Sequence, residues 1–470
     1  MNDLLRFGVS AFLTLWLGVA NLATAQPVAI DLGTLGGTYS QTYDINASGQ
    51  IVGFSYTAGD AASHAFSWTA SGGMRDLGTL GGSVSQARKV NDKGQVVGVS
   101  FTADDAGTHP FSWTATGGMV DLGTLGGTVA YAVDVNESGA VVGFSTIAGD
   151  GHRHAFLWTQ TGGMVDLGTL GGPDSTAYAI NDLGQVVGTS QIAGGFARAF
   201  LWTATGGMVD LGTLGHFTNG SVAYAVNNNG QVVGSATHAS LWTAATGMVD
   251  LGTLGGDGSG AVDVNEHGDV VGASYVPGNT VTHAFRWTST TGMVDLGTLG
   301  GDESTANAVN ELGEIVGYSK FSESAATHAF SWAPNTGMLD LGTLGGVSSQ
   351  AIDLNENGQI AGHSYTAGNA EVHVALWLLP FDVAAALERL TDQVSDFGLQ
   401  RGLTNALHAK LRAAAAGWQR GGSTSVVGEL NAFIHLVSAQ RGKALTDEQA
   451  DSLIGAAQAI VTAIESGRTN

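Results

Sequence analysis

Cysteine is absent from the 470 residues of this chain. Its absence excludes disulfides, a thiolate nucleophile, a cysteine metal site and lipid attachment to a cysteine. The fold must therefore be held by its hydrophobic core and by contacts between its parts.

Basic residues are scarce: 17 Lys and Arg stand against 40 Asp and Glu, for a net charge of −23. The imbalance is regional, because residues 26–380 hold 30 acids and 8 bases, while residues 381–470 hold 9 and 8. Such an acidic region repels nucleic acid and anionic membranes, so we expect no nucleic-acid partner. The charge favours solubility outside the cell, or binding of cations and basic partners.

Long hydrophobic runs are also missing, apart from residues 7–22. This run is shorter than the roughly 20 residues of a membrane-spanning helix. It follows Arg6 and precedes Ala-Thr-Ala at residues 23–25, the pattern of a secretory signal peptide cleaved before Gln26. We predict a signal peptide at 1–25, no membrane span, and export to the periplasm, the cell surface or the medium.

The dominant feature is a repeated heptapeptide, Asp-Leu-Gly-Thr-Leu-Gly-Gly. The copies begin at Asp31, Asp76, Asp121, Asp166, Asp210, Asp250, Asp295 and Asp340. The fifth copy ends in His216 in place of its last glycine. Spacings of about 40–45 residues indicate a propeller or a solenoid.

Each repeat contains four segments typical of β-strands, which in the first repeat are residues 42–46, 50–55, 64–69 and 74–80. The first two are joined by Asn-x-x-Gly, here Asn46 to Gly49, which predicts a tight hairpin turn. The last repeat stops at Pro380 without its fourth strand, whereas residues 28–35 supply one before the first repeat. We therefore predict an all-β, eight-bladed β-propeller over residues 26–380, with four-stranded blades and closure by the N-terminal strand.

The third segment of each repeat carries a tryptophan, such as Trp68, which strand alternation places on one face with His64 and Phe66. We expect the tryptophan to fill the space between sheets. The histidine recurs in seven repeats, and Arg198 replaces it in the fourth. Successive histidines stand a whole repeat apart without a ligand spacing, so we expect a hydrogen-bonded structural role and no metal site.

The loops of a propeller sort into a uniform face of Asn-x-x-Gly and Gly-Gly-Met turns and a face of variable loops. Binding usually lies on variable loops of a rigid scaffold. At the junction of the fourth and fifth repeats an enlarged loop stands beside a shortened one, which predicts a notch. The candidate ligand-binding residues are Arg198, His216, Phe217 and Asn219 there, together with Asp174 from the variable loop before the fourth repeat.

Residues 381–470 change to Ala, Leu, Gln and charge, and four segments have helical periodicity: 384–394, 403–418, 426–440 and 447–464. Thr446 and Gln449 fit a capping box before the last of them. We predict a small all-α bundle as a separate C-terminal domain.

Two resemblances accompany these patterns. The repeats resemble the bacterial extracellular family named for the tripeptide His-Ala-Phe, seen at residues 64–66, 154–156, 283–285 and 328–330. The tail, with Leu-Thr-Asn-Ala-Leu at 403–407 and Gln-Arg-Gly-Lys at 440–443, resembles the FIMAH-type helical module of exported bacterial proteins. Both imply an exported bacterial protein, and neither implies an activity or site residues.

No Ser-His-Asp signature, phosphate-binding loop or zinc spacing is present, so no catalytic residue and no cofactor is predicted. Ca²⁺ would suit the acidic region, but no calcium motif supports it. The sequence favours a non-catalytic exported scaffold that binds an extracellular protein or glycan through its variable-loop face. The alternative is an enzyme acting on extracellular polysaccharide, which would place two unrepeated carboxylates about 5–10 Å apart in one deep pocket.

Overall fold

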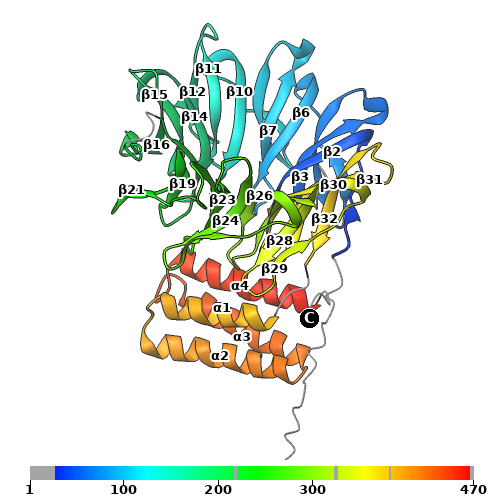
Figure 1. Ribbon diagram of the computed structural model, residues 1–470, viewed down its shortest axis with the longest axis vertical. Coiled ribbons are helices and arrows are strands. Elements are labelled where there is room, and N and C mark those ends of the chain that lie inside the picture. Colours follow the sequence, from blue (N-terminus) through cyan, green and yellow to red (C-terminus); the bar gives the residue numbers. More distant parts are fainter. Residues whose placement is uncertain (1–26, 216–219, 322–325, 380–382, 466–470) are drawn as a thin grey trace, which may run out of the picture.

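The computed structural model describes residues 27–215, 220–321, 326–379 and 383–465. The predicted signal peptide and three candidate residues, His216, Phe217 and Asn219, lie outside these ranges. The described chain is mostly β-structure built of four-stranded units, followed by a bundle of four helices (Figure 1).

Every unit begins with two strands joined by an Asn-x-x-Gly turn. The first strands are β2 (Gly36–Ile45), β6 (Gly81–Val90), β10 (Gly126–Val135), β14 (Gly171–Ile180), β18 (Val222–Val226), β22 (Ser259–Val264), β26 (Gly300–Val309) and β30 (Gly345–Leu354). The second strands are β3 (Ile51–Thr57), β7 (Val96–Thr102), β11 (Val141–Ile147), β15 (Val186–Ile192), β19 (Val232–Ala236), β23 (Val270–Tyr275), β27 (Ile315–Phe321) and β31 (Gln359–Thr366).

The third strand of each unit carries the tryptophan, and the fourth ends at the aspartate of the heptapeptide. The third strands are β4 (Ser63–Thr69), β8 (Thr108–Thr114), β12 (Arg153–Thr159), β16 (Ala197–Thr203), β20 (His238–Thr243), β24 (Thr282–Thr288), β28 (Thr327–Ala333) and β32 (Val372–Leu378). The fourth strands are β5 (Gly73–Asp76), β9 (Gly118–Asp121), β13 (Gly163–Asp166), β17 (Gly207–Asp210), β21 (Gly247–Asp250), β25 (Gly292–Asp295) and β29 (Gly337–Asp340). Strands within a unit pair antiparallel in chain order.

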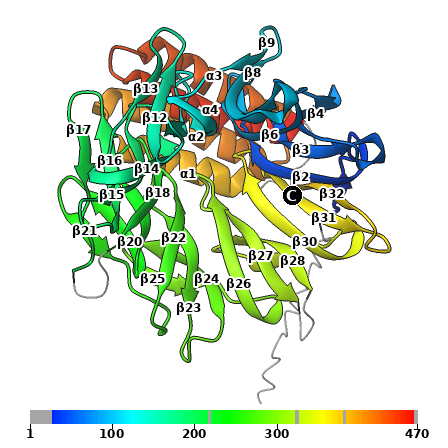
Figure 2. The ribbon, with the colours of Figure 1, turned by 90° about the horizontal axis from the view of Figure 1, so that it is seen from above.

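The two ends of the repeat region meet. The eighth unit has only β30, β31 and β32 of its own, and β1 (Ile30–Asp31) pairs antiparallel with β32. The first strand β2 also contacts β30 as well as β6, and Figure 2 shows the blue β2 beside the yellow β30–β32. The N-terminal strand is shorter than the predicted 28–35, because the heptapeptide turns away from the sheet after its first residue.

The hairpin turns of the eight units are joined by one set of hydrogen bonds. In each unit the Nδ2 group of the turn asparagine donates to the backbone oxygen of the next turn asparagine, at 2.9–3.3 Å. The donors are Asn46, Asn91, Asn136, Asn181, Asn227, Asn265, Asn310 and Asn355. The last bond returns from Asn355 to Asn46 at 3.0 Å. These asparagines therefore link neighbouring units in addition to shaping their own turns.

The heptapeptide forms the crossing between units and not an outer strand as the sequence suggested. In its first copy Asp31 Oδ1 accepts from Gly33 N, and Gly33 takes a φ of +73° that favours glycine. A Cβ on Gly37 would lie 2.7 Å from Thr57 O, so the start of β2 packs too closely on β3 for any side chain. The same residues therefore recur in the copies of the heptapeptide because each copy follows the same backbone path.

The repeated histidine binds the aspartate that heads the heptapeptide. His64 Nδ1 lies 2.8 Å from Asp76 Oδ2, and the same bond recurs at the other histidines of the third strands. These pairs are His109–Asp121, His154–Asp166, His238–Asp250, His283–Asp295, His328–Asp340 and His373–Asp31. The expected hydrogen-bonded structural role is confirmed.

The core lies between neighbouring units, and in six of them a fully buried phenylalanine of the third strand fills it. Phe66 is fully buried, as are Phe111, Phe156, Phe200, Phe285 and Phe330 at the same position. The repeated tryptophan is only partly buried in most units, including Trp68; Trp113 and Trp377 are the buried examples. The expectation that tryptophan fills the interface is therefore wrong for most units.

One inter-unit hydrogen bond is lost through two matched changes. In other units a backbone N–H of the third strand donates to a serine of the next unit, as Ala65 N does to Ser85 Oγ at 2.8 Å. In the second unit the donor position is Pro110, which has no N–H, and the acceptor position is Ala130. Ala130 is fully buried, so a hydroxyl there would lack this donor.

The helical module comprises α1 (Val383–Asp396), α2 (Arg401–Gln419), α3 (Ser423–Gln440) and α4 (Asp447–Glu465). Its core includes Leu390, Leu411, Phe433 and Leu453. Gln449 N and Thr446 Oγ1 form the capping bond predicted before α4. Figure 1 shows the four helices together on one side of the β-structure, with α1 and α4 closer to the strands than α2.

Candidate functional site

A belt of side chains, all acidic except one asparagine, runs along the surface of the hairpin turns, which we call the turn face. The residue after each turn asparagine accepts a hydrogen bond from the backbone N–H of the preceding unit, as Asp92 Oδ1 does from Ala47 N at 2.8 Å. The members are Asp92, Glu137, Asp182, Asn228, Glu266, Glu311 and Glu356. The eighth position is Ala47, which has no acceptor and interrupts the belt.

Beneath the belt, the ends of the first strands line a cavity of about 290 Å³ that we call the inner cavity. It contains Asp44, Lys89, Asp134 and Asp353, which come from four consecutive units once the chain ends meet. Lys89 Nζ lies 2.7 Å from Asp44 Oδ1. The other Asp44 oxygen accepts from Val90 N in the next unit at 2.7 Å.

The remaining inner-cavity aspartates are engaged in the same way. Asp134 Oδ2 accepts from Ile180 N at 2.8 Å, and Asp353 Oδ2 accepts from Ile45 N at 3.4 Å. Asp263, at the same strand position in the sixth unit, accepts from Val309 N at 2.9 Å. Each carboxylate therefore fastens its unit to the following one, and this use accounts for the aspartates without a catalytic role.

The inner cavity perturbs its titratable groups. Burial raises the pKa of Asp134 to about 6, although Lys89 opposes the shift. Burial also raises the pKa of Asp353 well above its usual range, and the Asp44 carboxylate adds to the effect. Burial lowers the pKa of Lys89, but Asp44, Asp353 and Asp134 outweigh it and raise that pKa above its usual value. Lys89 is therefore held as a cation, unsuited to act as a nucleophile.

The helical module contacts the turn face mainly through the seventh unit. Leu312, in the turn after Asn310, packs against the helical core, and Arg389 Nη1 of α1 donates to Leu312 O at 3.2 Å. Other units carry Ser48, Lys93, Ser138, Leu183, Asn229, His267 and Asn357 at this position. Leu183 is 63% exposed, so the position itself does not require burial.

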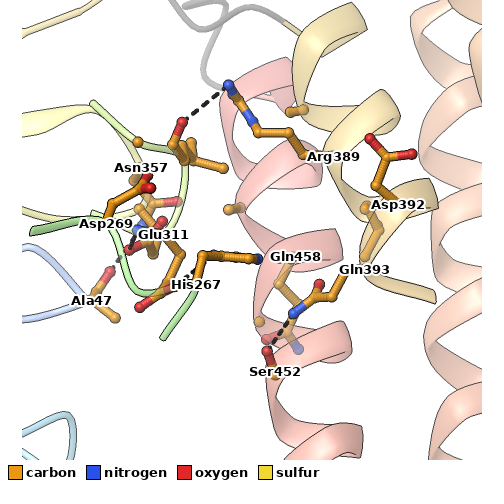
Figure 3. A pocket seen from close by; sticks show the side chains of 18 of the residues that line it. Ala47, His267, Asp269, Glu311, Asn357, Arg389, Asp392, Gln393, Ser452 and Gln458 are labelled. Atoms are coloured by element: carbon orange, nitrogen blue, oxygen red, sulfur yellow. Dashed lines mark hydrogen bonds and ion pairs between the residues drawn. The ribbon is translucent and has the colours of Figure 1, made fainter. Parts of the chain in front are cut away.

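Beside this contact lies the interdomain cleft, a cavity of about 640 Å³ between the turn face and helices α1 and α4 (Figure 3). The turn-face wall carries the belt residues Asp92, Glu311 and Glu356 together with His267. The helical wall carries Arg389, Leu390, Asp392, Gln393, Ser452, Gly455, Ala456, Gln458 and Ala459. Figure 3 shows Gln393 and Ser452, joined by a hydrogen bond of 2.6 Å, on the side opposite Asp269 and Glu311.

Part of the cleft wall departs from the repeat. Asp269 and Arg286 form an ion pair with Arg286 Nη2 2.7 Å from Asp269 Oδ2. In the first unit the equivalent residues, Gln50 and Ser67, form a neutral hydrogen bond of 2.9 Å. The sixth unit therefore replaces a polar bond with a charged pair where it lines the cleft.

Glu356 lies at the boundary of the two cavities, which also share Ala47 and Asp92. Burial raises the pKa of Glu356 to about 8, with the Glu311 and Glu314 carboxylates adding and Arg389 opposing. Its Oε1 accepts from Glu311 N at 2.9 Å. At neutral pH this carboxyl group is therefore largely protonated.

Of the predicted site residues, Asp174 and Arg198 lie within the described ranges. Asp174 is in β14, where its Oδ1 accepts from Arg153 N at 3.0 Å, with His152 Nδ1 at 3.6 Å. Arg198 is in β16, and its Nε atom is buried without a hydrogen-bond partner among the described residues. Neither residue lines the inner cavity or the interdomain cleft.

The variable loops hold several of their acidic or amide residues in structural clamps. Thr38 N donates to Asp60 Oδ1 at 2.8 Å, and Val347 N donates to Asn369 Oδ1 at 2.8 Å. Asp60 and Asn369 have φ values of 56° and 57°, a conformation that Asp and Asn tolerate. These side chains thus fix the start of the first strand.

Sequence reasoning missed the interdomain cleft. Leu312 in an otherwise polar turn position was one available signal, and the Asp269 and Arg286 substitutions were another. The position at which the helical module packs on the turn face could not be predicted from the sequence of the repeats or of the helical module alone.

The described residues show neither a metal site nor a membrane-spanning helix. No group of three or more His, Asp or Glu side chains in these ranges has an arrangement that could hold a metal ion. No helix among α1–α4 is long and apolar enough to cross a membrane.

Comparison with known proteins identifies the tail. Residues 383–462 match the FIMAH domain family, as the sequence motifs suggested. No curated protein sequence matches this chain. The repeat region therefore gains no family assignment from these comparisons.

Three solved structures share partial similarity with the chain. TolB from Acinetobacter baumannii has 11% identity and a TM-score of 0.32, covering 60% of this chain and 63% of its own. Porphyromonas gingivalis dipeptidyl peptidase 4 has 8% identity and a TM-score of 0.44, covering 74% and 60%. A gluconolactonase from Xanthomonas campestris has 12% identity and a TM-score of 0.29, covering 58% and 95%. The chain thus spans less than two thirds of the first two, and the likenesses assign no function.

Proposed function

We propose that this protein is an exported, non-catalytic binding scaffold whose ligand site is the interdomain cleft. The observation that carries the proposal is the cleft itself: about 640 Å³ between two structural units, lined partly by residues that depart from the repeat. Cavities of about 300–1,000 Å³ at domain boundaries are the usual size and place of small-ligand sites. This site replaces the variable-loop face as the first candidate.

The scaffold in this proposal is an eight-bladed propeller closed by its N-terminal strand, of the His-Ala-Phe repeat family. The bond from Asn355 to Asn46 and the pairing of β1 with β32 support closure. The signal-peptide pattern of residues 1–25 supports export.

A non-catalytic role is favoured because the inner-cavity carboxylates are committed to the backbone of the next unit. Both oxygens of Asp44 and of Asp134 already accept hydrogen bonds or an ion pair. A glycosidase requires a free acid and a free base or nucleophile on either side of one sugar bond. The alternative enzyme would have to release these bonds before it could act.

The test fills the cleft. Gly455 lies on the cleft wall, and a Cβ placed there meets no atom within 4 Å, so Gly455→Trp adds bulk without displacing the core. Gly428→Trp on α3 is the matched control, because Gly428 has equally open space and does not line the cleft. Calorimetric titration with hexamethylenediamine, maltotriose and Ca²⁺ should find a probe that binds the natural chain and the control but not Gly455→Trp. Binding unaffected by Gly455→Trp, or turnover of a chromogenic glycoside, would overturn the proposal.

A further inference from the structure

We propose that the interdomain cleft recognises an aliphatic amine: a ligand with a protonated amino group on a methylene chain. The inference deepens the proposed function and rests on it. It follows from three features of the cleft: its uncompensated carboxylates, its apolar wall, and its junction with a cavity that already holds an ammonium group.

The charge of the cleft is complementary to a cation. Its walls bear Asp92, Asp269, Glu311 and Asp392 against Arg286, Arg389 and His267, and the carboxyl group of Glu356 is largely protonated at neutral pH. Arg286 is neutralised by Asp269 at 2.7 Å, and the recorded hydrogen bond of Arg389 goes to a backbone oxygen. Glu311 Oε2 lies 3.1 Å from His267 Nδ1. Neither Asp92 nor Asp392 forms an ion pair with a described residue, so a cation gains more from this site than an anion does.

The helical wall suits a methylene chain. Leu390, Ala456 and Ala459 are apolar members of this wall, which also carries the hydrogen-bonded pair Gln393 and Ser452. No Phe, Tyr or Trp side chain lines the cleft among the described residues, so the large stacking surface on which sugar rings commonly rest is missing. An alkyl stem with a charged end can lie on this apolar surface while its head reaches the carboxylates.

The break in the acidic belt opens the cleft toward the inner cavity. Ala47 lacks the side chain that closes the belt elsewhere, and both cavities touch Ala47, Asp92 and Glu356. Inside, Lys89 Nζ already occupies an ammonium position 2.7 Å from Asp44. The inner cavity thus already contains a carboxylate–ammonium pair. Its ammonium group is carried on the methylene side chain of Lys89, as the amino group of the proposed ligand would be carried on its own methylene chain.

The experiment is calorimetric titration of the full chain with hexamethylenediamine, with hexanediol as its uncharged isostere and maltotriose as a neutral sugar. We expect the diamine to bind, hexanediol to bind at least about tenfold more weakly, and added salt to weaken the diamine. Gly455→Trp should abolish diamine binding, whereas Gly428→Trp should retain it.

Two charge variants sharpen the test. Asp392→Asn, on the exposed side of α1, should weaken the diamine about tenfold at pH 7 and at pH 9. Glu356→Gln should have little effect at pH 7, where the carboxyl group is largely protonated, and about a tenfold effect at pH 9. The control Asp60→Asn removes one charge from the variable loops at a position where Asn279 and Asn369 stand naturally, and should change affinity less than twofold.

The outcomes separate the two proposals. If maltotriose or hexanediol binds in a manner blocked by Gly455→Trp and the diamine does not, the amine inference falls and the binding cleft stands. If Gly455→Trp and the charge variants bind the diamine as tightly as the natural chain does, the amine inference falls as well. If no probe responds to Gly455→Trp, both proposals fall.

Discussion

His373 Nδ1 lies 2.8 Å from Asp31 Oδ1, across 342 positions of sequence. The same histidine–aspartate bond spans 12 positions in the other units, for example from His64 to Asp76. The first heptapeptide therefore performs for the last unit the task that every later copy performs for its own. In the same place Leu32 N donates to Val374 O at 3.0 Å.

Loss of this bond should loosen the junction of the two ends. We expect His373→Ala to lower the free energy of unfolding by about 1 kcal/mol, because the pair is partly exposed. Amide exchange at Leu32 and along β32 should rise, since β1 is held by few other contacts. His64→Ala is the matched control, and its effect on exchange should stay within β4 and β5. Equal and local effects of the two variants would contradict the special role of Asp31.

The buried phenylalanine should matter more than the neighbouring tryptophan. Phe66→Ala removes a fully buried ring and should cost about 3–5 kcal/mol in the free energy of unfolding. Trp68→Ala removes a larger but partly exposed ring and should cost clearly less. Urea unfolding of both variants measures the order, and a larger cost for Trp68→Ala would show that the core is misplaced.

Lys89 should govern the pH dependence of stability. The raised pKa of Asp134, about 6, means that its protonated form favours the folded state; this contribution is present at low pH and is lost as pH rises through about 6. Lys89→Met removes the cation that opposes the shift, so stability should fall more steeply between pH 5 and pH 8 than in the natural chain. At pH 8 we expect Lys89→Met to lower the free energy of unfolding by about 2 kcal/mol. The effect is no larger because solvent screens the partly exposed side chain of Lys89. Urea unfolding at pH 5 and at pH 8 measures the effect. If Lys89→Met lowers the free energy of unfolding by the same amount at both pH values, this account is wrong.

Leu312 should anchor the helical module. Leu312→Ser introduces the residue that Ser48 and Ser138 provide at the same turn position, so the turn itself tolerates it. The lost packing against the helical core should raise amide exchange in α1 and in α4. The control Leu183→Ser changes a 63% exposed leucine at the equivalent position and should leave both unchanged. An identical response to the two variants would place the anchor elsewhere.

Much of this architecture follows from the sequence because repetition exposes it. The Asn-x-x-Gly turns, the extra strand before the first repeat and the four helical segments are local patterns, and each corresponds to an observed element. The boundary of the fourth strand was misjudged because Leu77-Gly78-Thr79 looks like a continuing strand. The hydrogen bond that Gly78 N donates to Asp76 Oδ1, together with the positive φ of Gly78, ends the strand at the aspartate.

The site was less accessible because its parts are distant in sequence. Asp44 and Asp353 become neighbours only where the two ends meet, and Asp353 Oδ2 then reaches Ile45 N. Leu312 and Arg389 are joined only by the docking of the helical module. A repeated sequence pattern predicts the contacts that every unit makes with its neighbour. It does not predict a contact that occurs only once in the fold.

The meeting of the ends is the claim on which both the fold and the inner cavity depend, and a disulfide tests it most directly. Ile30 and Leu376 are register partners in β1 and β32, and the chain has no other cysteine to compete. Ile30→Cys with Leu376→Cys should form an intramolecular bond under mild oxidation, because paired strands hold Cα atoms within disulfide range. Digestion and mass spectrometry should then find residues 30 and 376 in one linked peptide. Two free thiols, or a bond only between molecules, would contradict closure by the N-terminal strand.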